Sequence, residues 1–153
     1  MPRGPSPTRT MSTEKTGHAM TVEEMTEFDP VLVAILQRQL DHISLQMGTI
    51  TTRTARSPIF SQSHDFSCFL SNADGETIAQ ADGLPIHSGS GGFAVRALLR
   101  DFPGRIEPED VFILSDTYAA GGNHLPDWTL IRPVFLDNQL VGFCSHRAHQ
   151  SDI

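Results

Sequence analysis

Apolar residues in this chain come in short runs that follow two different periodicities. In the first part of the chain they recur every three or four residues, which is the spacing of one face of a helix. Its members are Leu32, Leu36, Leu40, Ile43, Met47 and Ile50. Asp29-Pro30 predicts where this helix begins, because Asp is a good N-cap and proline is tolerated at the first helical position. The longest purely apolar run, residues 31–36, is far shorter than the roughly 18 residues of a membrane span.

After this helix the pattern changes to short strands. Two strands are predicted at 66–71 and 76–81, joined by a turn ending in Asp74-Gly75, a dipeptide typical of β-hairpins. The glycine-rich stretch 88–92 is interpreted as a turn that opens a second helix at 93–102. A short buried strand is expected at 111–114. A last hairpin is expected at 129–136 and 140–146 or beyond, with its turn around Asp137-Asn138. The predicted fold class is α+β: an N-terminal helix, β-hairpins, a second helix and a mixed or antiparallel sheet.

Charge and composition exclude several classes of function. The chain has 153 residues with 11 Lys+Arg against 18 Asp+Glu, a formal net charge of -7. Without a basic cluster it lacks the attraction to phosphate that dominates binding to nucleic acids and anionic membranes, so neither is an expected partner. Lys15, the only lysine, lies in a polar N-terminal stretch, so nucleotide chemistry would need a lysine from another polypeptide or segment. Cys68 and Cys144 lie in strand-like runs and predict buried thiols, which fits a reducing, cytoplasmic compartment.

The two ends of the sequence differ from its middle. Residues 1–28 carry Pro2, Pro5 and Pro7 among small polar residues and almost no large apolar residue, so a disordered tail is expected there. Residues 29–153 are expected to form one ordered unit. The sequence stops at Ile153, directly after a group of histidines and without a closing element. We therefore interpret it as the incomplete N-terminal portion of a larger domain.

The residues best suited to chemistry lie near the C-terminus. His124, His146 and His149 are three of the seven histidines, and Asp127 follows three residues after His124. Pro126 prevents an ordinary helix there, so 124–127 is predicted to be a turn that can aim both side chains at one point. Imidazole nitrogen and carboxylate oxygen suit zinc, manganese or ferrous iron. The segment is therefore a candidate site for a divalent metal ion.

The predicted last hairpin supplies a third ligand. With Asp137-Asn138 as a two-residue turn, His149 lies opposite Pro126, and a register one residue looser places it opposite Asp127. Because side chains alternate along a strand, His146 and His149 point to opposite faces, and the tight register favours His149 at the site. Two alternatives stay open: a hydrogen-bonded turn without metal, and His149 as a surface residue.

His87, just before the glycine-rich stretch, is a further candidate. It is interpreted as a general base or a substrate contact. The alternative is a buried histidine that bonds to the backbone. Asp116 follows a predicted strand, where an aspartate often caps a turn.

Several separate motifs, in the right order along the chain, resemble the hydantoinase B/oxoprolinase family. They are Asp29-Pro30-Val31, Arg53-Thr54-Ala55-Arg56-Ser57-Pro58, Asp65-Phe66-Ser67-Cys68, Asp74-Gly75, Ile86-His87-Ser88-Gly89-Ser90, Asp110-Val111-Phe112-Ile113-Leu114, Gly122-Asn123-His124-Leu125-Pro126-Asp127 and Arg147-Ala148-His149. The resemblance covers residues 29–153, and family members are several-fold longer than this chain. The family that the chain resembles includes N-methylhydantoinase B subunits, and acetone carboxylase forms a related branch.

The resemblance implies ATP-dependent opening of cyclic amides such as hydantoins or 5-oxoproline, or carboxylation of ketones in the related branch. It also implies that a hydantoinase A-type subunit handles ATP, and hence a hetero-oligomer. The family's metal ligands fall on His124, Asp127 and His149, and Asp116 falls on a catalytic-site position. The expected protein is thus a B-type subunit that uses zinc or manganese, with iron as an alternative. The other interpretation is a non-catalytic structural or interaction fragment of the same family.

Overall fold

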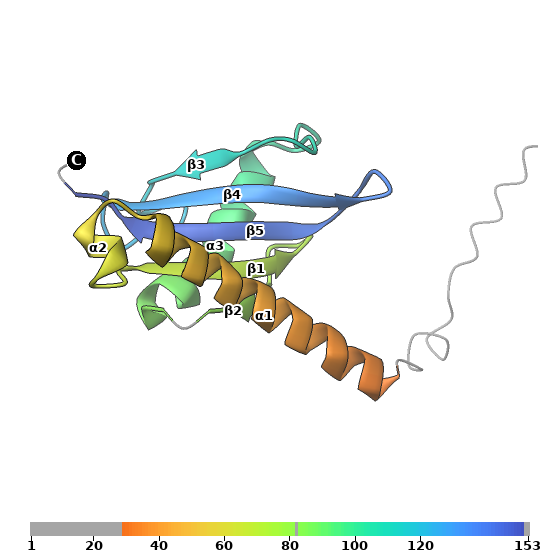
Figure 1. Ribbon diagram of the computed structural model, residues 1–153. Helices are drawn as coiled ribbons and strands as arrows, with labels where there is room; N and C mark the ends of the chain where they lie inside the picture. Colours follow the sequence, from red (N-terminus) through yellow and green to blue (C-terminus); the bar gives the residue numbers. More distant parts are fainter. Residues whose placement is uncertain (1–28, 82, 152–153) are drawn as a thin grey trace, which may run out of the picture.

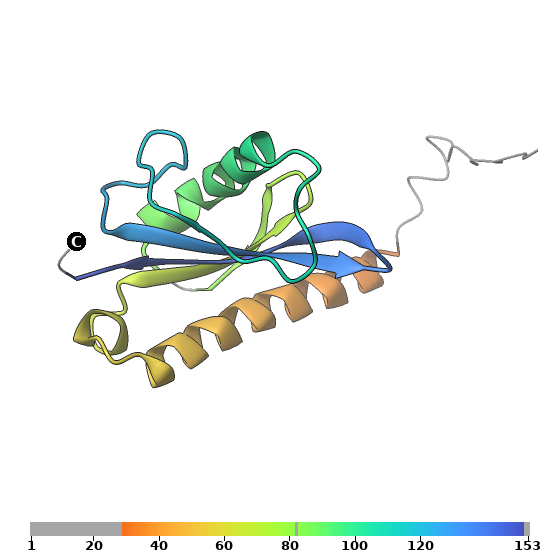
Figure 2. The same ribbon diagram turned by 90° about the horizontal axis from the view of Figure 1, so that it is seen from above.

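The computed structural model describes residues 29–81 and 83–151, so the disordered tail predicted at 1–28 lies outside the described residues. In chain order the elements are α1 (Pro30–Thr54), α2 (Pro58–Ser61), β1 (Phe66–Asn72), β2 (Thr77–Gln80), α3 (Pro85–Asp101), β3 (Phe112–Leu114), β4 (Asp127–Leu136) and β5 (Gln139–His149). The strands form one antiparallel sheet in the order β2-β1-β5-β4-β3 (Figure 1). Helices α1 and α3 cover opposite faces of this sheet (Figure 2). The predicted α+β class is confirmed.

Helix α1 begins where the sequence predicts, but only part of the predicted apolar stripe packs on the sheet. The Asp29 carboxylate accepts the N–H of Val31 at 2.8 Å, as expected of an N-cap. The predicted apolar stripe is wrong in part, because half or more of the Leu36 and Ile50 side chains is exposed to solvent. The one fully buried position is Ser44, whose hydroxyl donates to the Leu40 carbonyl within the helix. A small residue there lets α1 approach β1 and β2 closely. No helix in the described part of the chain has the length and apolarity needed to cross a membrane.

Helix α3 corrects the interpretation of the glycine-rich stretch. The helix begins at Pro85, so Gly89 and Gly91 lie inside it rather than in a turn before it. Gly91 faces the sheet, and a Cβ there would lie 2.6 Å from ring atoms of Phe69. The absence of a side chain is what allows the helix to lie this close to β1. A tertiary contact has overridden the low intrinsic helix propensity of glycine.

The strand predicted at 111–114 exists as β3, but the expectation that it is buried is wrong. Strand β3 lies at one edge of the sheet and pairs only with β4. Ile113 is 57% exposed as a result. At the opposite edge, the Gln37 side chain from α1 donates a hydrogen bond of 2.9 Å to the Ile78 carbonyl of β2.

The two faces of the sheet carry separate apolar clusters. On the α3 side the cluster contains Phe69, Ala94, Val95, Ala97, Leu98, Ala120, Ile131 and Phe143. On the α1 side it contains Phe66, Cys68, Ala81 and Ala148, with Met47 and Phe60 packed against it. Both cysteines are free thiols. Burial raises the pKa of Cys68 to about 11, as expected for a structural thiol.

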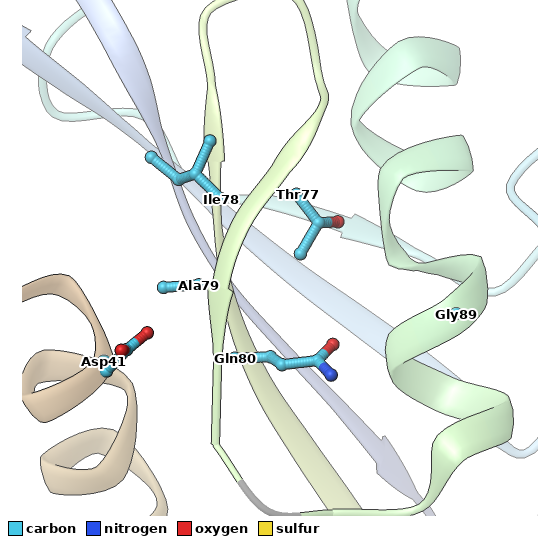
Figure 3. Close-up of a pocket in the computed structure, with 6 residues that line it drawn as sticks. All are labelled: Asp41, Thr77, Ile78, Ala79, Gln80 and Gly89. Carbon is cyan, nitrogen blue, oxygen red and sulfur yellow. The ribbon is translucent and has the colours of Figure 1, made fainter. Parts of the chain in front are cut away.

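A surface hollow of about 500 Å³ lies at the β2 edge (Figure 3). Asp41 from α1 and Gly89 from α3 stand on either side of it, and residues 77–80 of β2 form its floor. None of the histidines predicted to bind metal lines this hollow.

Candidate metal centre

The predicted site forms where the turn before β4 meets the end of β5. The N–H of Asp127 donates to the His124 carbonyl at 3.1 Å, so 124–127 is the expected turn. Strand β5 pairs Leu136 with Gln139 next to the hairpin turn, but a bulge between Val134 and Phe135 shifts the register by one residue. Further along the hairpin, Asp127 therefore lies directly opposite His149. This is the looser of the two registers considered for the sequence.

Three side-chain atoms converge at this point. His124 Nε2 lies 2.9 Å from Asp127 Oδ1, and His149 Nδ1 lies 3.0 Å from the same His124 nitrogen. The third side of the triangle, from His149 Nδ1 to Asp127 Oδ1, is 3.5 Å. The structure thus brings together the three residues predicted from sequence, and they form a group that could hold a metal ion.

The triangle has the dimensions of a metal coordination sphere. Bonds of about 2.1 Å place neighbouring ligand atoms roughly 3.0 Å apart in an octahedral site and roughly 3.4 Å apart in a tetrahedral one. The observed separations of 2.9, 3.0 and 3.5 Å lie within about 0.1 Å of these values. The donor set of two imidazole nitrogens and one carboxylate oxygen suits zinc, manganese or ferrous iron. On both counts the residues present fit a divalent metal ion.

Burial differs sharply among the three side chains. The Asp127 side chain is only 1% exposed, whereas that of His124 is 53% exposed and that of His149 is 27% exposed. The carboxylate therefore forms the floor of the cluster, and the two imidazoles form its solvent-facing side. A ligand reaching this point from solvent would approach past the histidines.

The second oxygen of Asp127 has its own partners. Asn123 Nδ2 donates to Asp127 Oδ2 at 3.2 Å, and His87 Nε2 lies 3.5 Å from the same oxygen. His87 comes from the first turn of α3, and its Nε2 also lies 3.9 Å from Asp65 Oδ1. Partners on Oδ2 hold the carboxylate so that Oδ1 points at the two histidines.

His87 is almost completely buried, and its Nδ1 has no hydrogen-bond partner in the described part of the chain. Burial lowers its pKa below the ordinary value, although the nearby Asp127 and Asp65 carboxylates oppose that shift. The imidazole is therefore held neutral at neutral pH. The alternative considered for it, a buried histidine bonded to backbone, differs from what is seen, because its ring nitrogen faces two carboxylates.

Asp116 is not drawn into the cluster. Its carboxylate accepts the backbone N–H groups of Tyr118 and Ala119, both at 2.7 Å, which is a turn-capping arrangement. These two bonds also lower the pKa of the carboxyl group. Within the described residues, no hydrogen bond or ion pair joins Asp116 to His124, Asp127 or His149.

His146 lies on the other face of the sheet, as strand alternation predicts. Its ring stacks on Phe66 in the α1-side cluster, with centroids 5.6 Å apart. Burial lowers its pKa, and its Nε2 has no hydrogen-bond partner among the described residues. The assignment of His149 rather than His146 to the candidate site therefore follows the geometry of β5.

Sequence reasoning assigned no role to two residues near the candidate ligands, Asn123 and Arg147. Asn123 directly precedes His124, and its amide holds Asp127. Arg147 lies on β5 two residues before His149, so it shares the face of the sheet on which His149 lies. Strand alternation was the signal that could have identified Arg147.

An antiparallel sheet between two helices, with a His-Asp-His cluster at one end, defines an α+β domain with a candidate metal centre. Residues 29–153 match the sequence profile of hydantoinase B/oxoprolinase, and the chain belongs to this family. The family resemblance noted from the motifs is thereby confirmed.

Named relatives lie in several branches. The 5-oxoprolinase of Dictyostelium discoideum is 37% identical over 128 residues, which cover 84% of this chain and 10% of that protein. The crystal structure of the ATP-dependent caprolactamase from Pseudomonas jessenii superposes with a TM-score of 0.72 at 30% identity, covering 83% of this chain and 22% of that one. Nucleotide-free acetone carboxylase gives a TM-score of 0.73 at 27% identity, covering 82% and 17%. The chain spans less than a quarter of the length of each of these proteins.

Proposed function

We propose that His124, Asp127 and His149 bind a divalent metal ion, with zinc or manganese favoured and iron as an alternative. We propose further that the chain serves as the B-type part of an ATP-dependent enzyme that opens a five-membered cyclic amide such as a hydantoin or 5-oxoproline. The observation that carries this proposal is the triangle of His124 Nε2, Asp127 Oδ1 and His149 Nδ1, with sides of 2.9, 3.0 and 3.5 Å.

The chemistry needs two activations. The carbonyl of a ring amide is a poor electrophile, and ATP can activate it by phosphorylation on an A-type partner, since Lys15 is the only lysine in this chain. A divalent ion at the cluster would act as a Lewis acid on the carbonyl oxygen or would lower the pKa of bound water toward about 7. In this chain the buried Asp127 would be the fixed anionic ligand, and because His124 is exposed, the solvent-facing side of the cluster stays accessible.

His87 and Asn123 would hold Asp127 in place during this reaction. Because His87 is only 2% exposed, we assign it an orienting role on Asp127 Oδ2 in preference to direct contact with substrate. A catalytic role for Asp116 remains a prediction from the family resemblance, and the capping bonds of its carboxylate give it a structural role as well.

Metal analysis of the purified protein tests the site directly. The wild-type chain is expected to hold about one ion per molecule, and His124→Ala is expected to weaken binding by about 100-fold or more, since loss of even an outer partner typically costs 10–100-fold. His42→Ala is the matched control, because His42 is an exposed histidine on α1 whose ring hydrogen-bonds the Gln46 side chain, away from the cluster. Equal metal occupancy in wild type and His124→Ala would dismiss the assignment.

A ketone carboxylase is the second candidate function. The TM-scores for acetone carboxylase and caprolactamase, 0.73 and 0.72, do not separate them. Sequence identity favours the cyclic-amide branch, with 37% to a 5-oxoprolinase against 27% to acetone carboxylase. Incubation with ATP, an A-type partner and either 5-oxoproline, hydantoin, or acetone with bicarbonate would distinguish them by product. Absence of product from all three would favour the non-catalytic interpretation.

A further inference from the structure

Arg147 is a buried cation that the proposed chemistry does not use. Its side chain is fully buried on the α3 side of β5. No carboxylate in the described part of the chain lies within ion-pair distance of it. Burial lowers the pKa of Arg147, and the charge of Asp127 opposes that shift only from beyond ion-pair distance. A buried charge without a direct ion-pair partner is costly unless polar groups surround it closely.

The guanidinium is satisfied by four neutral oxygen atoms from three parts of the chain. Arg147 Nε donates to Thr129 Oγ1 on β4 at 2.7 Å. Its Nη1 and Nη2 atoms donate to the carbonyls of Gly121 and Ala120, both at 3.0 Å, in the loop before β4. Nη1 also donates to the Ser90 hydroxyl on α3. One rigid, planar group thus ties β4, β5, α3 and this loop together.

Apart from Ser90 on α3, the residues joined in this way lie close in sequence to the three candidate ligands. Arg147 is two residues before His149, and its partner Thr129 is two residues after Asp127. Its partner Gly121 is three residues before His124.

The loop before β4 is held tightly at Gly121. Gly121 has a φ of 65°, and a Cβ there would lie 2.9 Å from the Cβ of Phe93, so the loop backbone packs directly on α3. The carbonyls that Arg147 binds are therefore fixed in position.

We propose that Arg147 is a positioning residue for the metal site. It holds the loop before β4 against β5 and α3, so that His124 and Asp127 already face His149 before a cation binds. This role rests on the metal-binding function proposed for those three residues. A lysine could not replace it, because one ammonium nitrogen has three donors and cannot reach the Thr129, loop and Ser90 oxygens at once.

The test compares Arg147→Lys with the matched control Arg132→Lys. Arg132 lies on β4 with its side chain 57% exposed and pairs with Glu109 at the surface. Zn²⁺ affinity is measured by calorimetry and normalised to the folded fraction from circular dichroism, and the absorption spectrum of bound Co²⁺ reports ligand geometry. Arg147→Lys is expected to weaken Zn²⁺ binding by about 10–100-fold and to alter the Co²⁺ spectrum. Arg132→Lys is expected to change neither.

A purely structural role would lower the stability of Arg147→Lys but leave the folded molecules with wild-type affinity and spectrum. A folded Arg147→Lys that binds Zn²⁺ less than threefold more weakly than wild type would overturn the proposal.

Should Arg147→Lys not fold, Ser90→Ala decides the question, because it removes one acceptor of Arg147 from a half-buried helix position. A weakening of threefold or more supports the proposal, and a smaller change overturns it. If the wild-type protein itself binds no Zn²⁺, the proposed function fails, which is a different outcome from wild-type binding that is insensitive to these variants.

Discussion

Gly89 and Gly91 offer a direct test of how α3 is seated on the sheet. Both lie inside the same helix, so replacing either with alanine gains a similar intrinsic helix propensity, about 0.5–1 kcal/mol. Their surroundings differ. A Cβ at Gly89 meets nothing within 4 Å, whereas a Cβ at Gly91 lies 2.6 Å from Cε2 and Cζ and 2.9 Å from Cδ2 of Phe69. The comparison therefore isolates the cost of the steric overlap.

The Phe69 ring cannot move aside cheaply, because it is fully buried in the α3-side cluster. Inserting a methyl group into a well-packed core typically costs about 1–3 kcal/mol. Gly89→Ala is expected to stabilise the protein, and Gly91→Ala to be less stable than Gly89→Ala by that amount.

Thermal unfolding measured by circular dichroism checks this expectation. For a chain of this size, 1 kcal/mol corresponds to roughly 2–4 °C, so the melting temperatures of the two variants should differ by roughly 2–12 °C. Equal melting temperatures would refute the reasoning, because they would mean that α3 does not approach β1 as closely as described.

Two further predictions concern buried titratable groups. Burial lowers the pKa of His146. The imidazole therefore stays neutral in the folded protein, whereas in the unfolded chain it gains a proton near its ordinary pKa of about 6.5. The free energy of unfolding is therefore expected to fall as the pH drops below about 6.5. His146→Phe, which keeps the ring against Phe66, should reduce the loss of stability in urea titrations between pH 7 and 5, and an unchanged pH dependence would contradict this. Burial raises the pKa of both thiols, that of Cys68 to about 11, but Cys68 is fully buried whereas Cys144 is only half-buried. Iodoacetamide at pH 8 should therefore label Cys144 before Cys68 in the folded protein. Preferential labelling of Cys68 in mass spectrometry would count against the packing described.

Local signals in the sequence were sufficient for several features of the site. The cap at Asp29, the turn at 124–127 and the hairpin turn at Asp137-Asn138 depend only on neighbouring residues. Both residues of that hairpin turn adopt positive φ, as a tight two-residue hairpin requires. Strand alternation, also a local property, placed His146 and His149 on opposite faces.

The packed face of α1 and the start of α3 were not available from local signals. The stripe of leucine and isoleucine on α1 indicated one face, yet the helix buries Ser44, because close approach to the sheet favours a small residue. The glycines at 89 and 91 indicated a turn, yet they lie in a helix, because the Phe69 ring occupies the space that a side chain at 91 would need. Both errors arise from contacts between elements distant in the sequence.

What the sequence alone determined is therefore the chemistry of the site: which residues could bind a cation, on which face of a strand they lie, and to which family the motifs belong. The tertiary structure decided the alignment of those residues. The bulge at Val134 and Phe135 shifts β5 by one residue and sets His149 opposite Asp127, while α3 brings His87 to the second carboxylate oxygen. The reason is physical, since residue type and alternation are encoded locally, but register and helix seating depend on packing across the whole sheet.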